Sequence, residues 1–327
     1  MVKQATGWDG AWSRRTRTSV RGVDLTERIT SRHGELLLFA LTPPRLTTTP
    51  ERAREIAELT VERLRPVSPD GLVLYDIDDE SERNPQERPF PFLPTMDPAD
   101  YLAQHLQAPW PTVVYRALGK YDGDQLDDWI HAQDASRTLA VLVGGSSSSQ
   151  QLTVPLPEAQ RRLGAARPDM VLGSVAIPER HTRRGDEQGR MLAKQAGGVQ
   201  FFVTQVVYDV NAAKNLVSDY HYACLEAGVE PVPLVFTFSV CGSEKTLDFL
   251  TWLGVDVPRW IANELRHATD TLDQSYELAL ATARDLLAWC RHLGVPVGFN
   301  VESVSIRREE IEASVRLAGE LGALLHR

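Results

Sequence analysis

The stretch GGVQFFVTQVVYDVNAAKN, residues 197–215, contains one complete structural unit of the fold. A glycine pair precedes a mostly apolar run, and after Asp209 the sequence changes to a helical pattern. A continuous apolar run of this kind is typical of a parallel strand that is covered on both faces. The stretch therefore predicts a buried strand that leads directly into a helix, with the amide of Gln205 near the end of the strand.

Similar apolar runs recur along the chain, with helical patterns between them. They span residues 35–40, 71–76, 112–117, 138–144, 170–177, 200–207, 231–238 and 295–302. One helical pattern begins at Thr49 and Pro50, an N-cap residue followed by proline at the first helical position. This alternation predicts an α/β protein with a single (β/α)8 barrel of the TIM type. A doubly wound sheet is the alternative, but the glycine fingerprint of that fold is missing after the first strand.

Length and composition set the limits of the fold and of the function. The 327 residues suffice for one such barrel, and we expect an N-terminal extension over 1–34 and the barrel over 35–327. A net charge of −9 argues against a nucleic-acid surface, and no apolar run reaches the ~20 residues of a membrane span. Three cysteines without a CxxC pair predict a reduced cytoplasmic protein without a zinc site. The number of subunits stays open, with a homo-oligomer among the options.

Barrel enzymes form their sites at the carboxyl ends of the strands, so the polar residues at those positions are the candidates. Among them are Asp76, Arg116, Glu179, Gln205, Thr237, Ser239, Asn300 and Glu302. A carboxyl group buried there has a raised pKa, which suits an acid at neutral pH. Asp76, Glu179 and Glu302 are therefore the candidate catalytic residues. From the residues alone, a hydrated loop also explains Asp76, and a strand or loop cap also explains Gln205.

Several segments resemble one enzyme family. VTQVVYDV at 203–210, SVAIPERH at 174–181 and FLTWLGVDVPRWI at 249–261 look like segments of methylenetetrahydrofolate reductases. That family has a (β/α)8 barrel, which agrees with the strand pattern. The resemblance implies reduction of 5,10-methylenetetrahydrofolate to 5-methyltetrahydrofolate, with FAD as cofactor and NADH or NADPH as electron donor.

The same resemblance implies roles for individual residues. Gln205 falls where the family holds the pterin ring, and a carboxamide offers a donor and an acceptor together. Phe249 falls where an aromatic ring stacks on the substrate. Glu187 and Lys194 fall where the family contacts the flavin, and Ser146 falls where an aspartate lies near it.

The chain also departs from the family pattern. The family's general acid, a glutamate in the first strand, is replaced by Ala40, and a methyl group cannot transfer a proton. Ser146 in place of the aspartate weakens the expected flavin site. Two hypotheses follow. Either another carboxylate serves as the acid and the protein is a reductase, with or without FAD, or it is a folate-binding one-carbon transferase or accessory protein that has lost redox activity.

Overall fold

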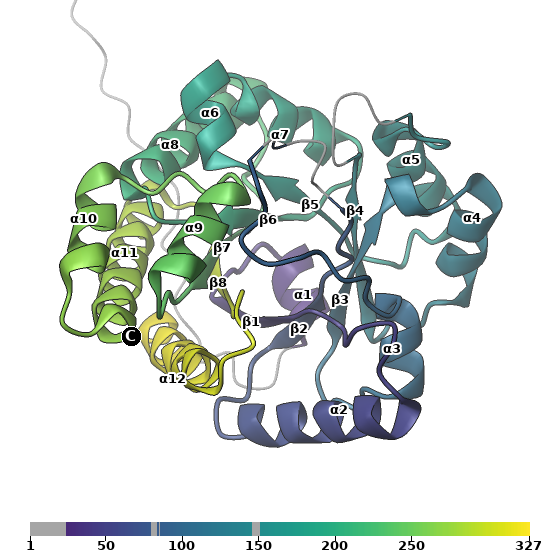
Figure 1. Ribbon diagram of the computed structural model, residues 1–327. Coiled ribbons are helices and arrows are strands. Elements are labelled where there is room, and N and C mark those ends of the chain that lie inside the picture. The colour runs from purple at the N-terminus through teal and green to yellow at the C-terminus, as the bar shows by residue number, and fades with distance from the viewer. Residues whose placement is uncertain (1–23, 80–83, 85, 146–150) are drawn as a thin grey trace, which may run out of the picture.

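The computed structural model describes residues 24–79, 84, 86–145 and 151–327. In this part of the chain, parallel strands close into one barrel, in which each strand pairs with its neighbours in sequence and the last pairs with the first (Figure 1). The strands are β1 (Leu36–Leu41), β2 (Gly71–Leu74), β3 (Thr112–Ala117), β4 (Thr138–Val143), β5 (Leu172–Ala176), β6 (Phe201–Val206), β7 (Leu234–Ser239) and β8 (Val297–Glu302). The predicted single (β/α)8 barrel is confirmed.

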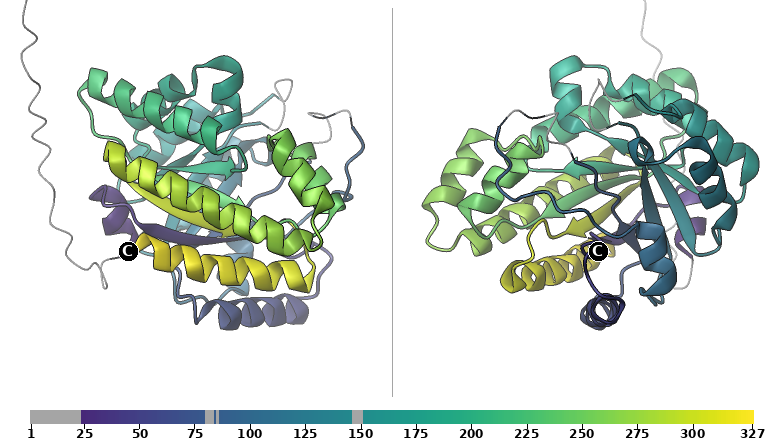
Figure 2. Two further views of the ribbon diagram at one scale, coloured as in Figure 1. Left: turned by 90° about the vertical axis from the view of Figure 1, so that its left-hand side faces the viewer. Right: turned by 45° about the vertical axis from the view of Figure 1, so that its right-hand side comes forward.

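Helices surround the barrel, and the views of Figure 2 show α11 and α12 side by side along one wall. No described helix combines the length and the apolarity needed to cross a membrane. The helices are α1 (Leu25–Thr30), α2 (Pro50–Leu64), α3 (Pro98–Gln104), the 3₁₀ turn η1 (Leu118–Lys120), α4 (Gly123–Ala132), α5 (Leu156–Ala166), α6 (Pro178–Arg184), α7 (Glu187–Ala196), α8 (Val210–Ala227), α9 (Glu244–Trp252), α10 (Arg259–His267), α11 (Thr271–Leu293) and α12 (Arg308–Leu325).

Local signals position the helix ends. The side chain of Thr49 accepts a hydrogen bond from the backbone N–H of Arg52, so α2 begins at Pro50 as the sequence predicts. At the end of α11, Gly294 has a φ of 72°, a left-handed conformation that glycine adopts without a steric penalty.

The core has two layers because successive side chains of a strand point to opposite faces. In β1, Leu36, Leu38 and Ala40 belong to the cluster inside the barrel, whereas Leu37 and Phe39 belong to the cluster between the strands and the helices. The other strands alternate in the same way, which defines the side chains that reach the mouth from inside.

Helix α1 lies behind the barrel in Figure 1, at the end opposite the strands' carboxyl ends. Its Leu25 and Ile29 are almost fully buried in the inner cluster. The guanidinium of Arg28 pairs with Asp70 at 2.5 Å, which ties the helix to the turn before β2. The amino-terminal end of the barrel is therefore closed, and the carboxyl-terminal end is the mouth.

A segment between β2 and α3 crosses in front of the mouth in Figure 1; we call residues 86–96 the strap. At one end, the indole N–H of Trp252 donates to the carbonyl of Gln86 at 2.9 Å. At the other end, Thr95 of the strap forms an antiparallel bridge with Arg45, in the loop that follows β1. The strap thus spans the mouth from α9 to β1.

Candidate functional site

A tyrosine and a carboxyl group meet at the mouth. Tyr75, directly after β2, continues the inward alternation of Val73, and Glu302 shares the inward alternation of β8 with Gly298 and Asn300. The hydroxyl of Tyr75 donates to Oε2 of Glu302 at 2.5 Å. The bond spans β1, which lies between the two strands in the barrel.

Ala40 lies beside this pair. Phe39 of β1 is in register with Val301 of β8, so that Ala40 and Glu302, the next residue of each strand, lie at the same level. The position at which the resembled family carries its acid is thus a methyl group here, and the neighbouring strand brings a carboxyl group to that height.

A directional hydrogen-bond chain lies below the pair. The amide of Asn300, which is fully buried, donates to Tyr75 Oη at 3.0 Å and to Thr237 Oγ1 at 3.2 Å. Thr237 in turn donates to the carbonyl of Thr204 at 2.8 Å. Because Tyr75 accepts from Asn300, its own proton is directed at Glu302. The chain fixes the tyrosine in the orientation that holds the carboxyl group.

The surroundings change the acidity of both groups. Burial raises the pKa of Glu302 to about 7, although the hydrogen bond from Tyr75 acts in the opposite direction. Burial and the neighbouring Glu302 raise the pKa of Tyr75 well above its usual value. The ring of Tyr115 packs edge-on against Tyr75, with centroids 5.0 Å apart. At neutral pH the tyrosine is a fixed donor, and the carboxyl group can hold or release a proton.

Asp76, another predicted catalytic residue, follows Tyr75 and has different neighbours. Its carboxylate accepts from the backbone N–H of Ala117 and the hydroxyl of Tyr121, both at 2.8 Å, and pairs with Lys120 at 2.5 Å. These contacts tie the end of β2 to the loop after β3. Asp76 thus holds the two loops together beside the mouth, and its catalytic role stays a prediction. Tyr75 is the residue that sequence reasoning missed, and counting by two from the buried Val73 finds it.

Gln205 lies on the opposite side of the mouth. It continues the inward alternation of Phe201 and Val203 in β6. Its amide N–H donates to the carbonyl of Leu253 at 3.3 Å, and its oxygen accepts from the backbone N–H of Val206 at 3.2 Å. A carboxamide has two N–H donors and two acceptor lone pairs, so the described residues leave one of each available to a ligand.

Glu179, the third predicted catalytic residue, begins α6 and packs near the same loop as Gln205. The side chain is 2% exposed, and its carboxyl group accepts from the backbone of Asp256. Burial raises the pKa of Glu179 to about 7. Its Oε2 has no hydrogen-bond partner in the described part of the chain.

Phe249 lies in α9 under the strap. Its ring stacks on Trp252, with centroids 6.3 Å apart, and meets the edge of Phe90 at 5.2 Å. The guanidinium of Arg88 lies 5.3 Å from the ring centroid. Side chains of the strap therefore cover the ring of Phe249. A ligand ring can stack on Phe249 when these strap contacts rearrange.

The expected flavin residues are engaged inside the protein. Glu187 is fully buried, and its Oε1 accepts a hydrogen bond from Arg180 at 2.5 Å. The same oxygen also accepts from the backbone N–H of Ile177. Lys194 donates to the carbonyl of Val175 at 2.7 Å, and burial lowers its pKa to about 8. The carboxylate of Glu187 is thus already neutralised by Arg180, so this pair does not fit the flavin contacts that the resemblance implies. Ser146 lies outside the described residues.

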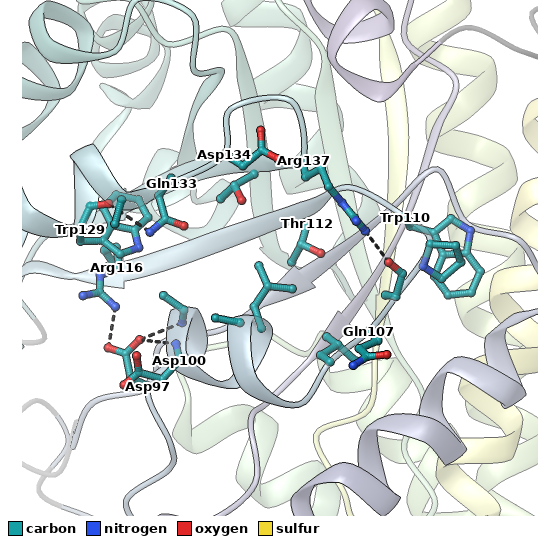
Figure 3. A pocket seen from close by; sticks show the side chains of 18 of the residues that line it. Asp97, Asp100, Gln107, Trp110, Thr112, Arg116, Trp129, Gln133, Asp134 and Arg137 are labelled. Carbon is teal, nitrogen blue, oxygen red and sulfur yellow. Dashed lines mark hydrogen bonds and ion pairs between the residues drawn. The ribbon is translucent and has the colours of Figure 1, made fainter.

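A groove with a volume of about 1260 Å³ lies on the outside of the barrel, along β3 between α3 and α4 (Figure 3). Arg116 pairs there with Asp97 at 2.6 Å, and its guanidinium lies 3.8 Å from the ring centroid of Tyr121. The prediction that places Arg116 on the mouth is therefore wrong, since Tyr115 is the inward residue of β3. The groove is separate from the mouth.

Comparisons with known proteins find similar solved structures. No family model and no curated protein matches the chain. A β-1,4-mannanase (10% identity, 89% of this chain, 98% of that chain, TM-score 0.46) and a 2,3-dimethylmalate lyase (11%, 90%, 94%, 0.40) are too remote to support an argument.

Another similar solved structure is that of an uncharacterized protein from Clostridium thermocellum that binds two copies of 5-methyl-5,6,7,8-tetrahydrofolic acid. It is 36% identical over 91% of this chain and 99% of that chain, with a TM-score of 0.80. The chain therefore belongs to the same family as this folate-binding Clostridium thermocellum protein.

Proposed function

We propose that the mouth of the barrel binds a reduced folate and that the protein acts on the one-carbon unit at N5 of that folate. The observation that carries the proposal is the relative with 36% identity, which binds 5-methyltetrahydrofolate. The free donor and acceptor of Gln205 support it, because the pyrimidine ring of a pterin presents a matching amide edge. In this assignment Gln205 orients the pterin, and Phe249 contacts the ligand once the strap rearranges.

The first candidate reaction is reduction of 5,10-methylenetetrahydrofolate to 5-methyltetrahydrofolate. Opening the methylene bridge needs a proton on the departing nitrogen, and a carboxyl group with a pKa of about 7 suits that step. The hydride comes from NADH or NADPH. FAD is not part of the proposal, because Glu187 and Lys194 are engaged by Arg180 and by the carbonyl of Val175.

The second candidate is transfer of a one-carbon unit from the folate to another acceptor. The relative binds the methylated folate, which is a product of reduction and also a donor for transfer. The nitrogen that loses the methyl group also needs a proton, so the same carboxyl group serves either reaction.

Two measurements on the purified chain test the proposal. Calorimetric titration with 5-methyltetrahydrofolate should show saturable binding, and its absence would reject the proposed function. The absorbance of NADH and of NADPH is then followed with and without 5,10-methylenetetrahydrofolate. Oxidation that depends on the folate supports the reductase. Folate binding without oxidation, together with movement of an isotope-labelled methyl group to an acceptor, supports the transferase.

A further inference from the structure

We propose that Glu302 is the proton donor to the bound folate and that Tyr75 is the residue that positions it, so that β8 supplies the acid that β1 lacks. This inference rests on the proposed function. It concerns the side of the mouth opposite Gln205.

Position is the first argument. Glu302 lies level with Ala40 on the adjacent strand, so its carboxyl group occupies the height at which β1 carries only a methyl group. A glutamate at position 40 would stand beside Glu302, and two like charges at that distance disfavour each other. The alanine is thus compatible with an acid that has moved by one strand.

Orientation is the second argument. Asn300 donates to Tyr75, so the tyrosine hydroxyl is left to donate to Oε2 of Glu302. No described residue forms a hydrogen bond with Oε1 of Glu302, and the side chain is half-buried at the mouth. Oε1 is therefore the oxygen that can present a proton to a ligand, while Oε2 is held.

The neighbouring groups do not compete for this role. The titratable groups that face Glu302 are Tyr75 from β2 and Tyr115 from β3, and burial raises the pKa of both, so they stay neutral. Helix α12 contributes the hydroxyl of Ser314, which donates to the backbone carbonyl of Glu302 at 3.2 Å. Asp76 is held by its ion pair with Lys120.

The carboxyl group of Glu302 gives its proton to N10 of 5,10-methylenetetrahydrofolate. The bond between the methylene carbon and N10 breaks, and its electron pair stays on N10. The methylene carbon becomes the iminium carbon on N5, and hydride from the nicotinamide converts it to a methyl group. Glu302 regains a proton from water, and Tyr75 keeps its own throughout.

The test compares the pH dependence of turnover in three variants. Glu302→Gln should lower the rate by about 100-fold or more and should leave folate affinity within about threefold of the wild type. Tyr75→Phe removes a hydrogen bond that favours the ionised carboxyl group, so the pKa of Glu302 rises. The active form is the one with a protonated Glu302, so the rate falls as the pH rises through the pKa of Glu302. In Tyr75→Phe this fall should occur roughly one pH unit higher than in the wild type. Tyr276→Phe is the matched control, since Tyr276 donates to Glu320 at 2.6 Å on the outside of the barrel, and no shift is expected.

Each outcome decides the assignment. A Glu302→Gln variant with the wild-type rate would overturn the proton-donor role. A Tyr75→Phe variant that loses rate equally at every pH would reduce Tyr75 to a packing residue. The infrared band of the protonated Glu302 carboxyl group is isolated by subtracting the spectrum of Glu302→Gln. Its pH dependence gives the pKa of Glu302 without turnover, and Tyr75→Phe should raise that pKa by the same amount as in the rate measurement. A wild type that binds folate but transfers neither hydride nor a one-carbon unit would reject the donor role, whereas a wild type that binds no folate rejects the proposed function itself.

Discussion

Tyr75 and Glu302 are 227 positions apart in the sequence, yet their side chains share a hydrogen bond of 2.5 Å across β1. Closure of the barrel produces this contact, because β8 pairs with β1 and β1 pairs with β2. The mouth therefore has two chemically different sides. One holds a carboxyl group fixed by a tyrosine, and the other holds the amide of Gln205 beside the loop at Leu253.

We expect Gln205→Ala to weaken the binding of 5-methyltetrahydrofolate by about tenfold, because one or two hydrogen bonds to the pterin are lost. The exposed amide of Asn263 on α10 provides the control, and Asn263→Ala should leave the affinity unchanged. Calorimetric titration measures both variants. If Gln205→Ala binds within twofold of the wild type, this amide does not contact the pterin.

Glu179 should make the stability of the protein depend on pH. Its folded pKa, about 7, is raised above the ordinary value of 4.5, so the folded state holds the proton to higher pH than the unfolded chain. The stabilisation is full below pH 4.5 and is lost as the pH rises through about 7. At about 1.4 kcal/mol per pKa unit, the loss is at most roughly 3.5 kcal/mol.

Glu179→Gln should remove this loss. At a pH of about 8 the variant should therefore be more stable than the wild type, and near pH 4.5 the two should be alike. Glu58→Gln, on the exposed face of α2, should follow the wild type. Urea unfolding at several pH values gives the free energies of unfolding. Parallel curves for Glu179→Gln and the wild type would contradict the assignment.

Much of the barrel can be predicted from the sequence because its strands are covered on both faces and therefore have continuous apolar runs. The run at 112–117 corresponds to β3 without a change of boundary, whereas the run at 71–76 ends as β2 two residues earlier, at Leu74. Beyond that point the apolar pattern no longer tells which side chain faces the mouth. The sequence therefore predicts Asp76 at the mouth, although the inward residue is Tyr75.

The engagement of the candidate flavin residues could not be predicted. The carboxylate of Glu187 is paired with Arg180, and the amine of Lys194 with the carbonyl of Val175. Both contacts depend on how α6 and α7 pack beyond the end of β5. A local sequence match reports the residue type at a position, but it does not report which internal group satisfies that residue.

Trp252 should report on folate binding through its fluorescence. It stacks on Phe249 and is hydrogen-bonded to Gln86 of the strap, so a ligand that displaces strap side chains from Phe249 also changes the surroundings of the indole. We expect Trp252→Phe to lose roughly half or more of the fluorescence change on binding, because among the described tryptophans this indole is the one that stacks on Phe249. Trp289→Phe, on the outer helix α11, should keep it. An unchanged signal in Trp252→Phe would show that the ligand leaves the strap in place.

Two glycine substitutions test how tightly the barrel interior is packed. A Cβ atom at Gly173 of β5 would lie 2.4 Å from the ring of Phe201, which is fully buried inside the barrel. Gly173→Ala should therefore destabilise the fold by about 1–3 kcal/mol. An added Cβ at Gly164, in α5, would have no described heavy atom within 4 Å apart from its own chain neighbours and the backbone of its own helix, so Gly164→Ala should stabilise the protein by up to about 1 kcal/mol, since alanine is the better helix former. Urea unfolding of both variants measures the difference, and equal stabilities would mean that the Phe201 ring yields without cost and that the inner layer is loosely packed.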